Sequence, residues 1–389
     1  MRTILAFAFR ASAAIAAVLS LAAAPIDQAP MKRHIDAIFA PIAKPGAPGL
    51  AVLVKYRGQV LFLKGYGVSN LRSGAMNTPD TNFRLASFSK QFTAMAVMLC
   101  VRDGKLHYED RLTDIFPDFP PYGKTITVRH LLTHTSGLLD YEDLMDRAEK
   151  AQARTIWSPE RQIQDEEVLQ LLEQAPAAEF AAGTKWAYSN SGYVVLGLIV
   201  AKVSGMSYGN FLQERIFAPA GIRRSVVYQK GIHDVSNRAF GHSLENGKWT
   251  ETDQSSTSAT LGDGGVYSNL EDLAKWDEAL ANHTLLSEQE MAPALRPVKL
   301  SDGSETRWPV EQDGDNLAPG KPVSYGFGWF LDPRNGHTRM WHTGSTIGFR
   351  TVIQRFPAER LTIVILANRA DVETKALSDQ IADLVLAAK

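Results

Sequence analysis

Segments with the pattern of β-strands lie at both ends of this chain, and a long, mostly helical stretch separates them. Near the start, Gly49–Tyr56 and Val60–Gly67 predict a hairpin that turns at Arg57-Gly58-Gln59. One antiparallel sheet completed by both chain ends, with the middle inserted as a helical part, accounts for this arrangement, so the fold class is predicted to be α+β. The strands predicted near the end are Gly326–Leu331, Arg339–His342, Phe349–Phe356 and Leu361–Ala367.

Helices are predicted beside the strands at each end and throughout the middle. Met31–Ala40 precedes the hairpin and Lys375–Ala388 follows the last strand, so these two terminal helices should flank the sheet. We expect the sheet part at roughly residues 30–75 and 320–389 and the helical part at roughly residues 80–315, with a catalytic cleft between them. The helical patterns of the middle cover Ser89–Arg102, Val128–Leu132, Glu166–Glu173, Gly192–Val203, Tyr208–Ile216 and Leu270–Ala281.

The first residues have the composition of a secretory signal. Arg2 and Arg10 come before an apolar run that ends in small residues. We expect residues 1–24 to be a signal peptide and residues 25–389 to be one catalytic domain, with an uncleaved membrane anchor as the alternative. The single cysteine, Cys100, excludes an internal disulfide. The expected location is the bacterial periplasm, and release outside the cell is the other possibility.

The charges of the chain nearly cancel, with 41 Lys and Arg against 42 Asp and Glu. No single-sign field would draw such a protein to nucleic acid or to an anionic membrane. Histidines with metal-binding spacing and cysteine pairs are absent from the sequence, so no metal and no cofactor is expected. The composition favours a small-molecule or short peptide substrate, predicts no integral membrane association, and leaves the oligomeric state open.

Ser87 and Lys90 are three residues apart at the start of an apolar helical pattern. Positions i and i+3 share one face of a helix, so the lysine amine can reach the serine hydroxyl. A serine needs a neighbouring base to become a nucleophile, and a lysine that is shielded from water can lose its proton and serve as that base. The pattern is common by chance, and an N-cap serine beside a solvated lysine is the alternative.

Three Tyr-x-Asn patterns occur, at Tyr188-Ser189-Asn190, Tyr208-Gly209-Asn210 and Tyr267-Ser268-Asn269. A tyrosine hydroxyl can relay a proton, and an asparagine side chain can hold a substrate amide. We expect the second tyrosine to pack in the first turn of a helix capped by Ser207, and the third pattern to supply a helix cap from Ser268 or Asn269.

The segment His342-Thr343-Gly344-Ser345 comes at the end of a predicted strand, where a backbone edge and small side chains can line a cleft. A similar segment, His134-Thr135-Ser136-Gly137, follows a predicted helix and is interpreted as a helix-ending turn.

In order and rough spacing, Ser87-x-x-Lys90, Tyr188-x-Asn190 and His342-Thr343-Gly344 resemble the three signature motifs of the class C beta-lactamase and D-alanyl-D-alanine carboxypeptidase family. The resemblance spans nearly the whole chain after the signal. It implies the sheet-and-helix fold described above. It also implies that substrate acylates Ser87, that Lys90 shares in proton transfer, and that Tyr188 is the general base or proton shuttle.

The same resemblance implies the substrate contacts. The backbone N–H groups of Ser87 and Ser345 would form the oxyanion hole. Asn190 would orient the substrate amide, while Thr343, with His342 and Gly344 beside it, would bind another polar group of the substrate.

His342 stands where the beta-lactamases of this family usually have a lysine. A mostly neutral imidazole grips a substrate carboxylate less strongly, so the expected reaction is D,D-carboxypeptidase or D-amino-acid peptidase cleavage. An esterase or a weak beta-lactamase of the same family is the alternative within the class, and a non-catalytic protein that binds penicillin or wall peptides is the alternative outside it. Arg339 or Arg350 could supply the missing charge, or both could be solvated strand residues.

Overall fold

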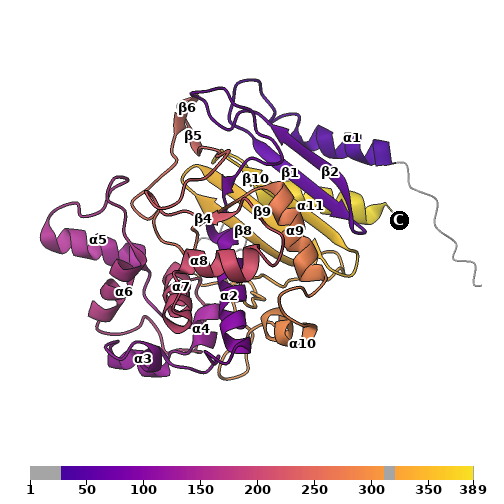
Figure 1. The fold of residues 1–389 in the computed structure, drawn as a ribbon. Coiled ribbons are helices and arrows are strands. Elements are labelled where there is room, and N and C mark those ends of the chain that lie inside the picture. Colours follow the sequence, from indigo (N-terminus) through magenta and orange to yellow (C-terminus); the bar gives the residue numbers. More distant parts are fainter. Residues whose placement is uncertain (1–27, 311–319, 389) are drawn as a thin grey trace, which may run out of the picture.

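The computed structural model describes residues 28–310 and 320–388, so the predicted signal peptide lies outside the described residues. The largest sheet among the described residues has five antiparallel strands in the order β2-β1-β10-β9-β8. The first two strands of the chain pair with its last three, which places the two ends of the chain in one sheet (Figure 1). The strands are β1 (Leu50–Tyr56), β2 (Gln59–Tyr66), β8 (Met340–Thr346), β9 (Phe349–Phe356) and β10 (Leu361–Ala367).

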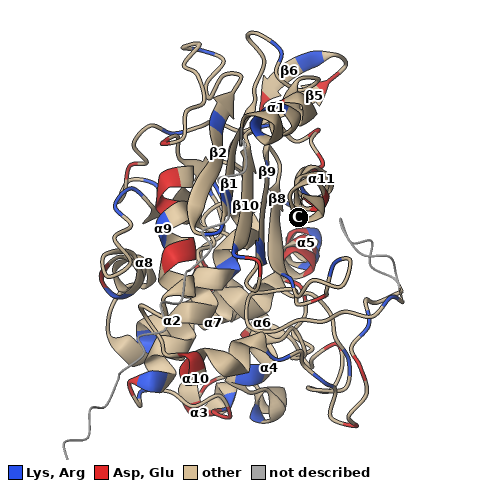
Figure 2. Ribbon diagram, turned by 90° about the vertical axis from the view of Figure 1, so that its right-hand side faces the viewer, with Lys and Arg blue, Asp and Glu red and all other residues tan. Residues whose placement is uncertain are grey.

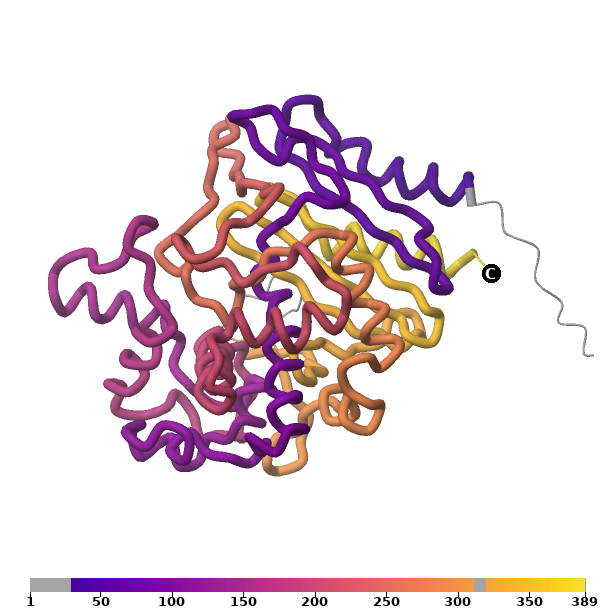
Figure 3. Tube along the Cα trace, in the orientation of Figure 1, coloured from indigo at the N-terminus to yellow at the C-terminus, as the bar shows by residue number. Residues whose placement is uncertain are grey.

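The central strands of this sheet are buried on both faces. Alternate residues of a strand point to opposite faces, and in β1 Leu50, Val52 and Val54 pack against the terminal helices α1 (Gln28–Phe39) and α11 (Thr374–Ala387). Ala51 and Leu53 point the other way, into the core that the sheet shares with the helical part. The tube in Figure 3 shows the indigo and yellow ends of the chain lying together in this layer.

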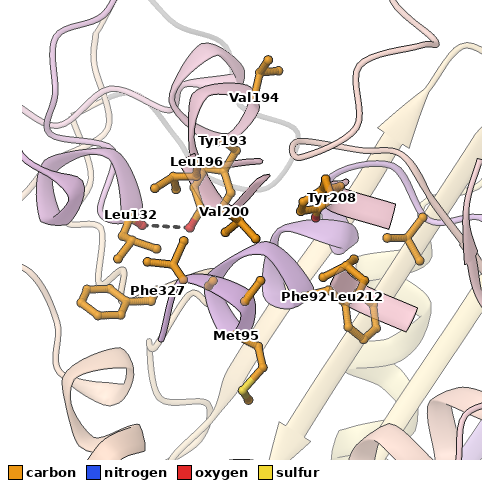
Figure 4. Packing of buried hydrophobic residues seen from close by; sticks show 14 of the residues in the cluster. Phe92, Met95, Leu132, Tyr193, Val194, Leu196, Val200, Tyr208, Leu212 and Phe327 are labelled. Carbon is orange, nitrogen blue, oxygen red and sulfur yellow. Dashed lines mark hydrogen bonds between the residues drawn. The ribbon is translucent and has the colours of Figure 1, made fainter. Parts of the chain in front are cut away.

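The helical part is built around α2 (Lys90–Arg102) and α7 (Asn190–Ser204), which pack directly against each other. Phe92 and Met95 of α2 belong to the same buried cluster as Tyr193 and Val200 of α7, and the Tyr193 hydroxyl donates a hydrogen bond to the Leu132 carbonyl (Figure 4). The remaining α-helices are α3 (Leu112–Ile115), α4 (Val128–Leu132), α5 (Tyr141–Gln152), α6 (Asp165–Gln174), α8 (Tyr208–Leu212), α9 (Leu270–Ala281) and α10 (Glu288–Met291).

Two smaller sheets are formed by short strands. A three-stranded sheet, β3-β7-β4, joins β3 (Phe83–Arg84) and β4 (Val226–Val227) through β7 (Val266–Ser268), and β5 (His242–Glu245) pairs with β6 (Lys248–Glu251). Figure 2 shows basic and acidic residues interspersed over the helices and loops.

Most of the predicted elements are present, and α4, α9, β9 and β10 have the predicted bounds. The predicted strand Gly326–Leu331 is wrong. Gly328 has a φ of +74°, and the Gly326 N–H bonds to the Trp329 carbonyl, so the segment turns back on itself and pairs with β8 only at Phe330 and Trp341. Its aromatic residues had the strand alternation, but its glycines form a turn.

In the part of the chain that the structure describes, no single helix is long and apolar enough to cross a membrane. The segments Asn190–Ser204 and Tyr208–Phe217 reach the required length and composition only as a pair, and the chain bends by 79° between them.

Candidate active site

Ser87 lies in a single 3₁₀ turn, Ala86–Ser89, that leads directly into α2. The residue before it, Ala86, has a φ of 50°, a left-handed conformation that costs energy for any residue with a side chain. Ser87 follows this bend directly and is half-buried, while its neighbours Ala86 and Phe88 are buried. A strained turn that presents one hydroxyl at a helix start suits a nucleophile.

The Lys90 amine is completely buried and lies 3.0 Å from the Ser87 hydroxyl oxygen. It also donates hydrogen bonds to Asn190 Oδ1 and to the Asp263 carbonyl, each at 2.9 Å. Burial lowers the pKa of Lys90 to about 8, although the carboxylates of Asp263 and Asp140 act in the opposite direction. Lys90 can therefore exchange a proton near neutral pH, which an exposed lysine cannot.

Tyr188 and Asn190 reach Lys90 from the start of α7. Ser189 caps this helix by accepting a hydrogen bond from the Gly192 N–H, so the helix begins two residues earlier than predicted. The Lys90 nitrogen lies 4.9 Å from the centre of the half-buried Tyr188 ring. The first and second sequence motifs thus meet at one amine.

The other two Tyr-x-Asn patterns do not reach this amine through their tyrosine hydroxyls. The Tyr208 hydroxyl is buried 2.6 Å from the Thr93 hydroxyl, which agrees with the predicted packing role. Tyr267 accepts a hydrogen bond from Arg238, and Asn269 caps α9. The pattern alone had not separated the three.

The third motif runs through the middle of β8 rather than at the end of a strand, and β8 is the edge strand beside the Ser87 turn. A Cβ atom on Gly344 would lie 2.0 Å from the Leu85 carbonyl oxygen, which accepts a hydrogen bond of 2.7 Å from Thr351. Only glycine permits this approach. Thr343 is half-buried and Ser345 is exposed, on an edge where backbone N–H groups can face a substrate.

His342 is buried, with 1% of its surface exposed. Its Nδ1 lies 2.6 Å from the Thr343 carbonyl oxygen and therefore carries the proton, which leaves Nε2 to accept a hydrogen bond of 3.1 Å from the Tyr325 hydroxyl. Burial, together with the nearby Lys90 charge, lowers the pKa of His342 to about 3. The imidazole is neutral and its polar atoms bind the protein itself.

The two arginines near the third motif have different surroundings. Arg339 is buried in ion pairs with Asp332 and Asp379, so it is neither solvated nor free for a substrate. Arg350 stands opposite Ser345 on β9, and its guanidinium donates hydrogen bonds to carbonyl oxygens, including that of Thr346 at 2.5 Å. Of the two, only Arg350 lies beside the exposed part of the motif.

Two residues at this site were missed from the sequence. Asp263, which no sequence motif singled out, supplies the carbonyl that binds Lys90. His134, in a segment interpreted as a helix-ending turn, stacks on Tyr188 with ring centres 4.4 Å apart. The turn interpretation of His134 is correct for the backbone, but it gave no sign of the contact. Across residues 28–310 and 320–388, His, Cys, Asp and Glu side chains form no group of three or more that could hold a metal ion.

Comparisons with known proteins show which family the chain resembles. The family model described as Beta-lactamase matches residues 35–388. Penicillin-binding protein 4* of Bacillus subtilis is 29% identical over 354 residues, which cover 87% of this chain and 72% of that protein. D-aminopeptidase of Brucella canis is 25% identical over 82% of this chain and 56% of its own length.

Solved structures share the fold. The octameric penicillin-binding protein homologue of Pyrococcus abyssi has a TM-score of 0.75 at 24% identity, covering 93% of this chain and 78% of its own. D-amino acid amidase of Ochrobactrum anthropi has a TM-score of 0.74 at 21% identity, covering 92% of this chain and 99% of its own. The chain belongs to the beta-lactamase family of serine hydrolases.

Proposed function

We propose that this protein is an exported serine hydrolase that forms an acyl-enzyme on Ser87 and cleaves short peptides or amides of D-amino acids. The observation that carries the proposal is the position of the Lys90 amine, 3.0 Å from the Ser87 hydroxyl and completely buried. The base can take the serine proton directly, without a water molecule between them. Burial has lowered the pKa of this base to about 8, so that part of it is uncharged near neutral pH.

The proposed reaction begins when neutral Lys90, with Tyr188 beside it, accepts the Ser87 proton as the serine oxygen attacks the substrate carbonyl. The negative oxygen that forms would accept hydrogen bonds from the backbone N–H groups of Ser87 and Ser345. The proton taken up by Lys90 would then pass through Tyr188 to the leaving amine as the amide bond breaks. A water molecule would hydrolyse the ester on Ser87 and restore the free hydroxyl.

Asn190 and Thr343 are the proposed substrate contacts. Asn190 already accepts a hydrogen bond from Lys90 through Oδ1, which leaves its NH₂ group to donate to a substrate carbonyl. Thr343 is half-buried on the edge strand, with Gly344 beside it keeping that strand close to Ser87. His342 would act by holding Tyr325, because its own ring is buried.

The neutral His342 supports a weaker grip on a substrate carboxylate, which argues against efficient antibiotic hydrolysis. A lysine at this position would place a fixed positive charge on the strand, whereas the imidazole, with a pKa of about 3, provides none. The relatives named as a D-aminopeptidase and a D-amino acid amidase support the proposed substrate class. An esterase of the same family would use the same residues with a different leaving group.

Residues 1–24 are the proposed export signal and residues 25–389 the proposed catalytic domain, which would place the reaction in the periplasm or outside the cell.

Purified protein and its Ser87→Ala variant should be assayed on a D-alanyl-D-alanine peptide, a D-amino-acid amide, a short-chain nitrophenyl ester and a chromogenic cephalosporin. We expect turnover of the peptide or the amide that is lost in the variant, and little hydrolysis of the cephalosporin. Equal turnover by the variant contradicts the proposal. Stoichiometric, long-lived labelling by penicillin without turnover of any substrate would instead favour the non-catalytic binding protein.

A further inference from the structure

His134 contacts the Tyr188 loop at three consecutive residues. Its carbonyl oxygen accepts a hydrogen bond of 3.0 Å from the Ala187 N–H, and its Nδ1 accepts one of 3.0 Å from the Ser189 N–H. Its ring stacks on the Tyr188 ring, with centres 4.4 Å apart and an angle of 34° between the planes. Both chain neighbours of Tyr188 and its ring are therefore held by one residue.

The backbone around His134 is also fixed. Its φ is 59°, a left-handed conformation that is unfavourable for a side chain of this size. Two further backbone hydrogen bonds of 2.8 Å join this segment to the chain that leads to Tyr188, from the Glu179 N–H to the Gly137 carbonyl and from the Gly183 N–H to the Thr135 carbonyl. The hydrogen bonds at His134, Thr135 and Gly137 hold this strained conformation in place.

The protonation state of His134 follows from these contacts. Because Nδ1 accepts from a backbone N–H, the proton of the neutral ring is on Nε2. Complete burial lowers the pKa of His134 well below its usual range, so the acceptor persists at neutral pH. Nε2 is also buried, and no acceptor lies within hydrogen-bonding distance of it among the described residues. A buried donor without a partner is unfavourable, so packing alone would be served better by phenylalanine.

We propose that His134 is a positioning residue that fixes Tyr188 beside Lys90 for proton transfer, chiefly through the hydrogen bond from the Ser189 N–H to Nδ1. This inference rests on the proposed function, in which Tyr188 moves a proton between Ser87, Lys90 and the leaving group. Errors of about 1 Å in such a position reduce reaction rates by roughly 100-fold.

Two substitutions separate the hydrogen bond from the ring contact. His134→Phe keeps a ring against Tyr188 but removes the acceptor. His134→Asn loses the ring but keeps an acceptor oxygen near the position of Nδ1, and asparagine tolerates the left-handed backbone. Val168→Ala, in the buried face of α6, is the matched control for a general loss of packing.

The first measurement is the inactivation of each protein by a fluorophosphonate, resolved into the maximal rate and the half-saturating concentration, alongside thermal unfolding. We expect His134→Phe to lower the maximal rate by about 10- to 100-fold with little change in half-saturation. His134→Asn should recover most of that loss, and Val168→Ala should lower the melting temperature with the rate unchanged. A wild-type rate for folded His134→Phe, or equal losses in both His134 variants, would overturn the inference.

The second measurement is hydrogen exchange of the peptide that contains Ala187 and Ser189, which does not depend on any reaction at Ser87. His134→Phe should speed exchange there, and His134→Asn should not. Unchanged protection in His134→Phe would contradict the positioning role. If the wild-type protein fails to react at Ser87, the proposed function fails, and hydrogen exchange still decides the role of His134.

Discussion

The Lys90 amine has three hydrogen-bond acceptors around it and no exposed surface. The contacts favour the charged form and burial disfavours it, and burial has the larger effect because the pKa falls from 10.5 to about 8. The site therefore contains a base that is partly neutral under physiological conditions. The same shift has consequences for both rate and stability.

The rate of acylation should rise with pH through about 8, because only neutral Lys90 can accept the Ser87 proton. His342 should not contribute to this profile, since its pKa of about 3 keeps it neutral throughout. Inactivation rates with a fluorophosphonate measured from about pH 6 to 9.5 test this. A rate that is flat or falls across that range would show that Lys90 is not the base.

Replacing Lys90 with methionine should abolish acylation and stabilise the fold at neutral pH. Between about pH 8 and 10.5 the folded chain binds fewer protons at Lys90 than the unfolded chain, so this group makes stability rise with pH in that window. At pH 7 the buried ammonium therefore costs up to about 3 kcal/mol.

Denaturant unfolding of Lys90→Met and wild type at pH 7 and near pH 10 measures the difference. The variant should be more stable at pH 7, and its advantage should shrink at the higher pH. A variant that is less stable at both values would mean that the three hydrogen bonds outweigh desolvation.

The sequence singled out Ser87, Lys90, Tyr188 and Asn190 from two separate motifs, and the structure brings these four residues together. Their roles in the reaction stay a prediction. The burial of His342 could not be foreseen, because it depends on Tyr325 and Phe330, which lie directly before and within the segment that was mistaken for a strand.

At the scale of elements, β8 and the Ser87 turn are in contact through backbone atoms. Gly344→Ala should push the strand away from Leu85, because the new Cβ atom would lie 2.0 Å from its carbonyl oxygen. We expect a destabilisation of about 1–3 kcal/mol and a loss of acylation.

Gly209→Ala, in α8, is the matched control. Its new Cβ atom would lie 3.5 Å from its nearest neighbour, Val227, which is an ordinary van der Waals contact. It should be neutral or slightly stabilising, since alanine favours a helix over glycine by roughly 1 kcal/mol. Thermal unfolding and fluorophosphonate labelling of both variants would decide the point. Equal behaviour of the two variants would mean that β8 can shift without consequence.

Element boundaries were predicted well where the apolar pattern was continuous, as in β9 and β10. Helix α5 was missed because it is rich in charged residues and buries only Tyr141, Leu144 and Met145, although the Asp140 cap marks its start. Whether such a segment forms a helix depends on its tertiary contacts rather than on its local sequence pattern.

At the scale of the whole molecule, Asp277 of α9 ties the sheet to the helical part. Its carboxylate contacts Lys55 of β1 at 3.0 Å, Arg355 of β9 at 2.8 Å and the Thr362 hydroxyl of β10 at 2.6 Å. Burial tends to raise the pKa of Asp277, but Arg355, Thr362 and Lys55 together hold it below its usual value. Three strands thus share one buried anion.

Asp277→Ala should destabilise the protein by about 3–5 kcal/mol, because two buried cations lose their main partner. Glu278→Ala, which removes the other, exposed carboxylate near Lys55, should cost less than about 1 kcal/mol. Because the folded pKa of Asp277 is lowered, its contribution is present at neutral pH and is lost as pH falls through that value. Denaturant unfolding of both variants at pH 7 measures the two losses of stability. Similar losses from the two substitutions would contradict the structural role assigned to Asp277.

The most direct test of the proposed function is to locate the covalent adduct. Wild-type protein and Ser87→Ala should be treated with penicillin and with a fluorophosphonate, and then analysed by intact-mass and peptide mass spectrometry. We expect one adduct per chain on the peptide containing Ser87 in the wild type and none in the variant. An adduct on any other residue, or an equal adduct in Ser87→Ala, would contradict Ser87 as the nucleophile.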